Sequence, residues 1–328
     1  MRIVFFGTPE FAVPSLRALL DEGADVVAVV TQPDRPQGRS RSTIVPPPVK
    51  TLAEERGLAV MQPERPRGDV FLANLRRVAP EVGVVVAYGH ILRPEVLAVP
   101  ARGMINVHAS LLPRHRGAAP IQAAILAGDL ETGVTVMRMD PGMDTGPILH
   151  QARTLIRPDE TGGQLASRLA ELGGRALTEA LVLLQQGVLR PEPQDETRAT
   201  YAPKLDRDQA RISWNDPGEE VVRRIRAFDP TPGAWTTLDG GELKLFGGRL
   251  AGAGAGRARG GEGGGGGAGG SEPGTILGVA SELVVATGAG DVAIADVQPA
   301  GRRRMTAAEW FRGREGTGTG AAVGWRFQ

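Results

Sequence analysis

The sequence predicts an α/β domain with a mostly parallel sheet, followed by a small all-β domain. Apolar strand patterns alternate with helical patterns up to Gly187, and the strand patterns are apolar on both faces. Strands of that kind belong to parallel sheets that helices cover on both sides. Beyond Gly187, short strand candidates are separated by glycines, which is typical of a small barrel or sandwich.

The expected elements of the first domain follow from the spacing of apolar residues. Short runs rich in β-branched residues predict strands, and apolar residues three and four positions apart predict helices. We expect strands at residues 2–7, 25–31, 82–88, 104–108, 134–139 and 148–152, and helices at 11–20, 52–58, 70–78, 121–127 and 164–186. Residues 33–48, with five prolines and three arginines, predict a polar loop.

Shifts in composition divide the chain. We expect a first domain at 1–189, a linker without apolar periodicity at 190–207, and a second domain at 208–328. Strands of the second domain are expected at 243–246, 274–277, 283–286 and 292–297. Residues 247–274 hold 15 glycines in 28 residues. Such a segment buries too little apolar area to offset its ordering entropy, so we expect a flexible surface insertion.

Composition excludes several classes of protein. The chain has no cysteine, which excludes disulfides and cysteine-ligated metal sites. No stretch approaches the roughly 18 apolar residues of a membrane helix, and the first residues lack a secretory signal pattern. We therefore expect a cytoplasmic protein without a membrane segment. The net charge of +1 does not by itself indicate a nucleic-acid partner.

The glycine after the first strand does not complete a dinucleotide-binding motif. Gly7 stands where a Gly-x-Gly-x-x-Gly motif begins, but Pro9 and Glu10 follow it. We therefore expect neither a nicotinamide nor a flavin cofactor. No metal is expected either, because no two histidines have the helix-face spacing of metal ligands among His90, His108, His115 and His150.

The strongest candidate site is the pair Asn106 and His108. Residues two apart on a strand point to the same face, so these side chains project together at the carboxyl end of the strand 104–108. Open α/β sheets hold their ligands at that end. An amide donor beside an imidazole can stabilise an oxyanion and move a proton. The alternative is that two polar residues merely close the strand.

A second candidate is the turn at 140–147, which joins two expected strands. Loops at strand ends carry function more often than cores do. Asp144 in this turn can reach a histidine and fix its tautomer, whereas a solvated turn aspartate is the alternative.

Together these residues resemble the pattern of the tetrahydrofolate-dependent formyltransferases. The pattern joins Asn106-x-His108 to the stretch at 110–117 and to Asp144-Thr145-Gly146. The resemblance extends along nearly the whole chain, through stretches at 5–11, 31–36, 86–89, 117–122, 194–196, 201–205 and 298–301. Ala109 and His115 depart from the residues usual in that family, glycine and Trp or Tyr.

The resemblance implies a Rossmann-like first domain and a C-terminal β-barrel of the oligonucleotide-binding kind. It implies transfer of a formyl group from 10-formyltetrahydrofolate to the amino group of methionine carried by initiator tRNA, without a metal. Asn106, His108 and Asp144 take the positions of the catalytic residues. The implied folate-binding residues are Ser110, Leu111, Leu112 and Pro113, with Tyr88, Gly89, Ile91, Leu92 and Asp140 beside the pterin.

In the implied mechanism, His108 as imidazolium and the Asn106 amide both donate to the formyl oxygen as it gains negative charge. Asp144 holds His108 protonated and oriented. A proton then returns to the folate nitrogen as it leaves.

The resemblance also implies contacts to tRNA through basic residues. A track of cations can follow an acceptor stem by phosphate contacts. The residues implied are Arg39 and Arg41 in the first proline-rich loop, Lys204 in the linker, and Arg302, Arg303 and Arg304 in the barrel. We expect a monomer that binds the folate donor and initiator methionyl-tRNA.

Three alternatives stay open at this point. A formyltransferase for glycinamide ribonucleotide or an amino sugar shares the catalytic pattern, but the first needs no second domain. A non-catalytic RNA-binding protein on the same scaffold does not need Asn106, His108 and Asp144. A dinucleotide dehydrogenase lacks its glycines here.

Overall fold

The computed structural model describes residues 1–37, 43–252, 271–315 and 325–328. The chain forms two compact units. The N-terminal unit comprises 1–120, 130–155 and 166–204, and the C-terminal unit comprises 121–129, 156–165 and 205–328. Two short segments from within the range 1–189 therefore belong to the C-terminal unit.

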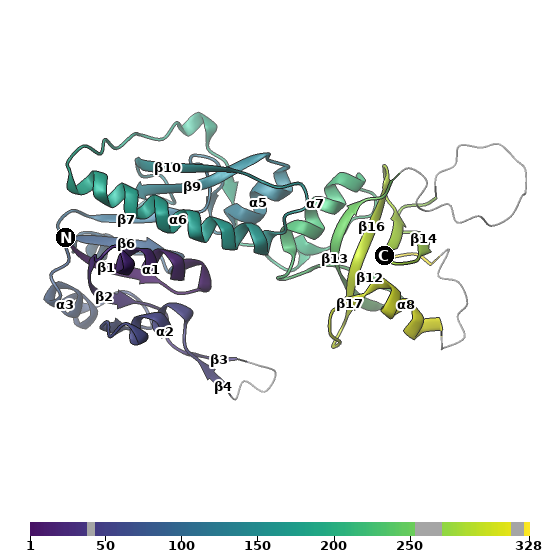
Figure 1. Cartoon of the computed structure of the whole chain (residues 1–328), viewed down its shortest axis with the longest axis horizontal. Helices are drawn as coiled ribbons and strands as arrows, with labels where there is room; N and C mark the ends of the chain where they lie inside the picture. Colours follow the sequence, from purple (N-terminus) through teal and green to yellow (C-terminus); the bar gives the residue numbers. More distant parts are fainter. Residues whose placement is uncertain (38–42, 253–270, 316–324) are drawn as a thin grey trace, which may run out of the picture. The chain divides into compact units, whose positions relative to one another are not determined.

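A seven-stranded sheet forms the centre of the N-terminal unit, in the order β10-β9-β7-β6-β1-β2-β5 (Figure 1). Its strands are β1 (Arg2–Gly7), β2 (Asp25–Val30), β5 (Val60–Met61), β6 (Val82–Val86), β7 (Met104–His108), β9 (Glu131–Arg138) and β10 (Ile148–Leu155). The five strands from β7 to β5 pair in parallel. Strand β9 is antiparallel to both of its neighbours, β7 and β10. The predicted mostly parallel α/β domain is therefore confirmed.

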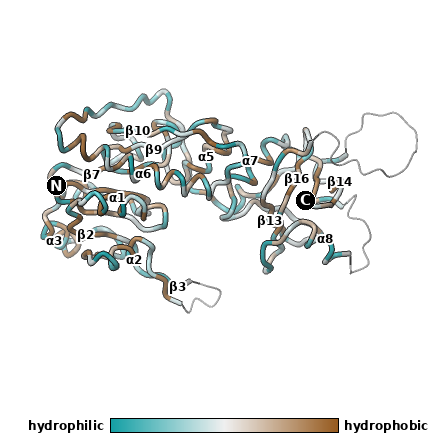
Figure 2. The backbone as a smooth tube through the Cα atoms, in the orientation of Figure 1, coloured by the Kyte–Doolittle hydropathy of each residue, from teal (hydrophilic) through white to brown (hydrophobic). Residues whose placement is uncertain are grey.

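The strand order reverses between β1 and β6, which is where open α/β sheets bind ligands outside the carboxyl ends of their strands. Apolar runs account for this sheet: all five residues of β6 are buried, and so are five of the six in β1. The hydrophobic parts of the backbone follow these strands (Figure 2). The polar loops after β1, β6 and β7 consequently meet at one edge.

Helices cover the sheet. They are α1 (Val13–Asp21), α2 (Pro48–Glu55), α3 (Asp69–Arg77), α4 (Pro94–Leu97) and α6 (Gly162–Gln185). Helices α1 and α6 lie over the same face (Figure 1). Two consecutive glycines explain how α6 comes close: an added Cβ at Gly173 would be 3.1 Å from Val107, and one at Gly174 would be 3.1 Å from the Pro14 oxygen of α1.

The predicted polar loop at 33–48 contains a short antiparallel pair, β3 (Arg35–Gln37) and β4 (Thr43–Val45). Residues 38–42 between them, with Arg39 and Arg41, lie outside the described residues. Asp34 holds the base of this pair: its carboxylate accepts from Lys50 Nζ at 2.7 Å and from Gln62 Nε2 at 2.6 Å. These hydrogen bonds keep the pKa of Asp34 below its ordinary value, Lys50 being the larger cause.

The segment predicted as a linker is docked on the N-terminal unit as far as residue 204. A 3-10 turn at Glu196–Arg198 precedes β11 (Tyr201–Ala202), which pairs in parallel with β8 (Arg116–Gly117). Apolar periodicity could not reveal this docking, because main-chain pairing and side-chain hydrogen bonds hold the segment.

The C-terminal unit is built on an antiparallel sheet, as predicted. Its order is β12-β13-β16-β15-β14, with β17 beside β16. The strands are β12 (Ala234–Leu238), β13 (Gly241–Leu250), β14 (Ile276–Val279), β15 (Leu283–Ala286), β16 (Asp291–Pro299) and β17 (Met305–Thr306). Helices α5 (Pro120–Ala127, from Ile121 on), α7 (Gly218–Phe228) and α8 (Ala307–Glu315) belong to this unit; the sequence analysis had not predicted α7 or α8.

Residues 325–328 connect the two edges of this sheet. The Ile276 N–H at β14 donates to the Trp325 oxygen at 2.7 Å, and the Gln328 N–H donates to Thr237 of β12 at 3.0 Å. The sheet is thereby closed into a ring, as in a barrel.

The predicted glycine-rich insertion begins later than expected. Strand β13 continues to Leu250, so residues 247–250 are strand rather than loop. Gly248 has a packing role there, since an added Cβ would lie 2.8 Å from Ile225 of α7. Residues 253–270 of the insertion lie outside the described residues.

Candidate active site

Asn106 and His108 lie at the carboxyl end of β7, on the strand predicted for them. The register of the sheet pairs Asn106 with Met137 and His108 with Thr135 of β9. His108 is 6% exposed, and Asn106 is half-buried. Among the described residues, the Asn106 amide has no hydrogen-bond partner, so its donor is available to a ligand.

Both ring nitrogens of His108 have defined surroundings. Nε2 lies 2.9 Å from the main-chain oxygen of His115. A carbonyl oxygen only accepts hydrogen bonds, so a hydrogen bond at this contact requires a proton on Nε2. Nδ1 lies 3.7 Å from Asp144 Oδ2.

Asp144 is held from two sides. Its Oδ2 accepts from the Gly117 N–H at 2.9 Å, and its main-chain oxygen accepts from Gln194 Nε2 at 2.8 Å. Its φ is +55°, an uncommon conformation for a residue with a side chain. The structure thus brings the three residues predicted as catalytic to one place, with Asp144 fixed by its neighbours.

Asp140 shapes the turn that carries Asp144. Its carboxylate accepts from the Thr145 hydroxyl at 2.8 and 2.9 Å and from the Gly142 N–H at 3.0 Å. Gly146 follows where no side chain fits, because an added Cβ would lie 1.9 Å from the Arg138 oxygen.

The predicted folate-binding stretch at 110–113 has its polar groups engaged. Ser110 is fully buried, and its hydroxyl donates to the Arg114 main-chain oxygen at 2.6 Å. The main-chain oxygen of Ser110 accepts from Thr135 Oγ1 at 2.7 Å. The Leu112 oxygen accepts from Gln151 Nε2 at 2.9 Å. Leu112 and Pro113 are buried and Leu111 is half-buried, so Leu111 is the side chain of this stretch nearest to solvent.

The predicted pterin-flanking stretch follows β6. The Tyr88 oxygen accepts from Thr8 Oγ1 at 2.9 Å and from Gln32 Nε2 at 3.0 Å. The Tyr88 ring is buried, which raises the pKa of its hydroxyl to about 12. Gly89 has a φ of +86°, Leu92 is buried, and Ile91 is 92% exposed.

Two polar atoms of this stretch are buried without a partner among the described residues, the Tyr88 hydroxyl and His90 Nε2. Their rings contact each other edge to face, with centroids 5.5 Å apart. Orphaned buried polar atoms are uncommon, and they fit a stretch that receives a polar heterocycle.

Sequence analysis missed the residues that hold the site from the segment 194–202. Arg116 is fully buried and binds Gln194 and Glu196, and the Thr200 hydroxyl accepts from the His115 N–H at 2.8 Å. The one sequence signal for these residues was the polar stretch 194–196, which resembles the family pattern but lies in the segment predicted as a linker.

The predicted tRNA-binding residues differ in their surroundings. Lys204 and Arg302 are exposed. Arg303 lies 3.5 Å from Glu309. Arg304 binds Asp229 at 3.1 Å and Asp296 at 2.9 Å, and its guanidinium lies 4.2 Å from the Phe246 ring centroid. Arg304 therefore has a structural role within the C-terminal unit.

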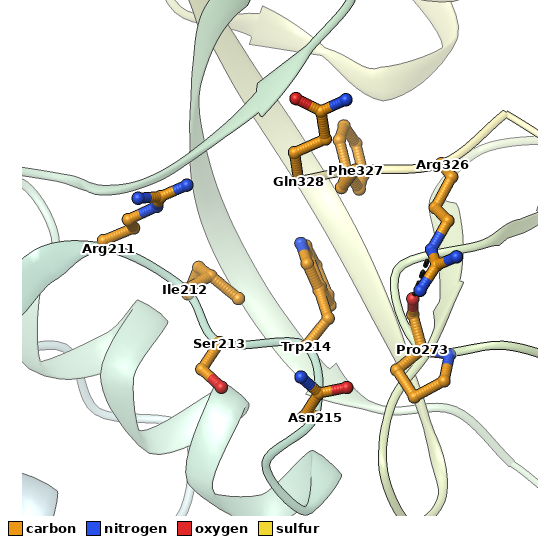
Figure 3. Close-up of a pocket in the computed structure, with 9 residues that line it drawn as sticks. All are labelled: Arg211, Ile212, Ser213, Trp214, Asn215, Pro273, Arg326, Phe327 and Gln328. Carbon is orange, nitrogen blue, oxygen red and sulfur yellow. Dashed lines mark hydrogen bonds between the residues drawn. The ribbon is translucent and has the colours of Figure 1, made fainter.

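A pocket of about 360 Å³ lies in the C-terminal unit (Figure 3). Trp214 and Phe327 stack within it at 5.3 Å, and Arg326 donates to the Pro273 oxygen. None of its lining residues belongs to the predicted site.

The part of the chain that the structure describes contains no helix long and apolar enough to cross a membrane. It also contains no group of three or more metal-ligating side chains.

Family models match both parts of the chain. The model described as "Formyl transferase" covers residues 1–181, and "Formyl transferase, C-terminal domain" covers residues 204–315. The α/β unit and the antiparallel C-terminal unit therefore match the two domains of a formyltransferase. The chain is a formyltransferase.

Relatives narrow this class. The chain is 49% identical to the methionyl-tRNA formyltransferase of Myxococcus xanthus over 315 residues, 96% of this chain and 95% of that protein. It is 45% identical to that of Geobacter sulfurreducens, with 98% of each chain covered. The identity is 47% with that of Synechococcus sp., covering 100% of this chain and 98% of the other. The chain therefore belongs to the methionyl-tRNA formyltransferase family.

Solved structures share the fold at lower identity. WlaRD, a sugar 3N-formyl transferase, has a TM-score of 0.66 at 17% identity and covers 92% of this chain and 99% of its own. HypX from Aquifex aeolicus, in complex with tetrahydrofolic acid, has a TM-score of 0.61 at 20% identity, covering 95% of this chain and 47% of its own. These likenesses concern the fold alone.

Proposed function

We propose that the protein transfers the formyl group of 10-formyltetrahydrofolate to the amino group of methionyl initiator tRNA, giving N-formylmethionyl-tRNA for translation initiation. The observation that carries this function is the 45–49% identity to methionyl-tRNA formyltransferases along both domains. The alternative function of a dinucleotide dehydrogenase is not supported, because the family and the relatives that match the chain are formyltransferases.

The Asn106 amide is the donor to the formyl oxygen in this proposal. When the amine attacks the formyl carbon, that oxygen gains negative charge, and a fixed donor stabilises it most at that moment. Support comes from the half-buried position of Asn106 and from the absence of a competing partner among the described residues.

His108 carries the proton through Nδ1 rather than donating to the oxyanion through Nε2. The sequence-based expectation gave His108 an oxyanion role; because its Nε2 lies 2.9 Å from the His115 oxygen, we assign the proton transfer to Nδ1 instead. As the amine nitrogen bonds to the formyl carbon, Nδ1 takes its proton; when the bond from carbon to the folate nitrogen breaks, Nδ1 returns a proton to that nitrogen. Asp144, 3.7 Å away, stabilises the imidazolium between these steps.

The folate donor supplies the formyl group and the leaving nitrogen. We propose that its pterin lies against the stretch 88–92 and Asp140, and that Leu111 contacts it from the stretch 110–113. The orphaned polar atoms of Tyr88 and His90 support this placement.

Contacts to tRNA are proposed for Arg39, Arg41, Lys204, Arg302 and Arg303. The structural engagement of Arg304 makes it the weakest of the six original candidates. A cytoplasmic location and a monomeric state remain our predictions.

One experiment tests the function. Purified protein is incubated with 10-formyltetrahydrofolate and, separately, methionyl initiator tRNA, methionyl elongator tRNA, glycinamide ribonucleotide or a nucleotide-linked amino sugar, and formylated product is measured. We expect formylation of the initiator tRNA. Preferential formylation of either small amine would overturn the proposal.

A further inference from the structure

We propose that Gln194 is a positioning residue for formyl transfer, which places Asp144 against His108 Nδ1. This inference rests on the proposed function. It concerns a residue that lies outside both candidate motifs, in the segment 194–202, which follows every strand of the N-terminal sheet.

The amide of Gln194 joins two groups of opposite hydrogen-bonding character. Its Oε1 accepts from Arg116 Nε at 3.1 Å and Nη2 at 2.8 Å. Its Nε2 donates to the Asp144 oxygen at 2.8 Å and to the Gly146 oxygen at 2.7 Å. A guanidinium only donates and a carbonyl only accepts, so the amide fits in one orientation alone.

Arg116 gives Gln194 a fixed support. Its guanidinium is fully buried, and Glu196 binds it with two oxygens, at 2.7 and 2.8 Å. Such a bidentate pair restricts both partners to one geometry. Glu196 raises the pKa of Arg116, so the guanidinium stays charged and keeps its donors.

Gln194 adds to two other supports of Asp144, the Gly117 N–H at its carboxylate and the Asp140 hydrogen bonds within the turn. Asp144 has a φ of +55°, which costs free energy and persists only where neighbours enforce it. One of those neighbours is the Gly117 N–H and another is Gln194, which grips the backbone on both sides of Thr145. Without the Gln194 amide, the main chain at Asp144 and Gly146 loses two hydrogen bonds, and we expect the carboxylate to shift relative to Nδ1.

The same segment also sets the second partner of His108. The Thr200 hydroxyl accepts from the His115 N–H, and the His115 oxygen accepts from His108 Nε2. His115 has a φ of +57°, another conformation that needs support. The segment 194–202 therefore fixes what lies at each nitrogen of the imidazole.

The test compares three variants of the full-length protein. Gln194→Ala removes the whole amide. Gln194→Glu keeps an oxygen for Arg116 but loses the donors to Asp144 and Gly146, so it folds with its anchor intact. Asp195→Ala is the matched control, since Asp195 only caps the turn through Thr197, at 3.0 and 2.6 Å, and does not touch Asp144.

Kinetics give the first readout. We expect kcat for methionyl-tRNA formylation to fall about 10- to 100-fold in both Gln194 variants, because small displacements of a reacting group are costly. KM for both substrates should change less than about threefold, and Asp195→Ala should keep kcat within about twofold. Equal kcat in the Gln194 and Asp195 variants would overturn the proposal.

The second readout does not depend on activity. The chain has four histidines, so an NMR spectrum of protein labelled with ¹⁵N-histidine contains few ring signals. The signals that disappear in His108→Gln are those of His108. The His108 ring signals should shift in both Gln194 variants and stay in place in Asp195→Ala, while His150 signals stay unchanged in all. Unshifted His108 signals would overturn the positioning role. If the wild type formylates only a small amine, the proposed function fails while this readout still decides on Gln194.

Discussion

The main-chain N–H of Gly117 donates to Oδ2 of Asp144 at 2.9 Å, so the loop after β7 and the loop after β9 are joined at the carboxylate. Gly117 has a φ of +115°, and an added Cβ would lie 2.6 Å from the Ala202 oxygen. The position therefore requires glycine for both conformation and space.

Gly117→Ala should destabilise the protein by about 2–4 kcal/mol and lower formylation, because strain and a backbone clash add at one residue. Urea unfolding and kcat measure the two effects. Gly103→Ala is the matched control: its φ is also positive, at +80°, but an added Cβ meets nothing within 4 Å. Similar losses in both variants would contradict the clash at Ala202.

Asn106→Ala should lower kcat by roughly two to three orders of magnitude, as removal of one oxyanion donor does elsewhere, about 3–4 kcal/mol. Binding of folate and tRNA should change little, because the donor acts mainly in the transition state. Single-turnover kinetics and equilibrium binding separate the two. A variant with near-normal kcat would remove Asn106 from the mechanism.

His108→Gln and His108→Asn distinguish the two ring nitrogens. A glutamine amide nitrogen lies near the place of Nε2 and can keep the bond to the His115 oxygen, so this variant should retain most of the stability. It lacks a titrating group at the Nδ1 position, so kcat should still fall by about two or more orders of magnitude. The asparagine variant should lose both the bond to the His115 oxygen and the activity. A highly active His108→Gln enzyme would contradict proton transfer through Nδ1.

Stability should depend on Glu196 in a pH-dependent way. Arg116 holds the pKa of the Glu196 carboxyl below its ordinary 4.5, chiefly by hydrogen bonding. A carboxyl with a lowered folded-state pKa stabilises the protein above the unfolded-state pKa, and this contribution is lost as the pH falls through the folded-state value. Glu196→Gln should therefore destabilise fully at neutral pH and progressively less below pH 4.5.

Thermal unfolding of this variant across pH measures the effect, with the exposed Glu171→Gln as control. A destabilisation by Glu196→Gln that stays constant from neutral to acid pH would argue against the ion pair.

Arg39→Ala should lower kcat/KM for methionyl-tRNA by roughly 1–3 kcal/mol and leave folate affinity unchanged, if its guanidinium holds the acceptor end. The efficiency should also fall steeply with salt, as counterion release requires. Arg304→Ala is the contrasting variant, since its loss removes the bonds to Asp229 and Asp296 and should act on stability. Unaltered tRNA kinetics in Arg39→Ala would point to another contact.

Periodicity predicted the central strands of the sheet well because β1, β6 and β7 are buried along nearly their whole length, whereas the half-buried edge strand β5 was not predicted. The segment β7, with Asn106 and His108, was placed to the residue. The two-residue spacing also gave the common direction of these side chains. Asp144 Oδ2 lies 3.7 Å from Nδ1 of His108, and its role toward that ring stays a prediction.

Other parts of the site left no periodic signal. The segment 194–202 docks through Gln194, Glu196 and Thr200, whose hydrogen bonds join residues far apart in the chain. The burial of Arg116 depends on those partners and cannot be read from an isolated arginine between two loops.

The docking of the segment 194–202 has a consequence for the order of synthesis. All seven strands of the N-terminal sheet leave the ribosome before Gln194 and Thr200 do, because β10 ends at Leu155. A nascent chain can thus form its sheet while His115 and Asp144 still lack their supports. On the proposed role of Gln194, formyl transfer by such a chain requires this segment to emerge and dock first.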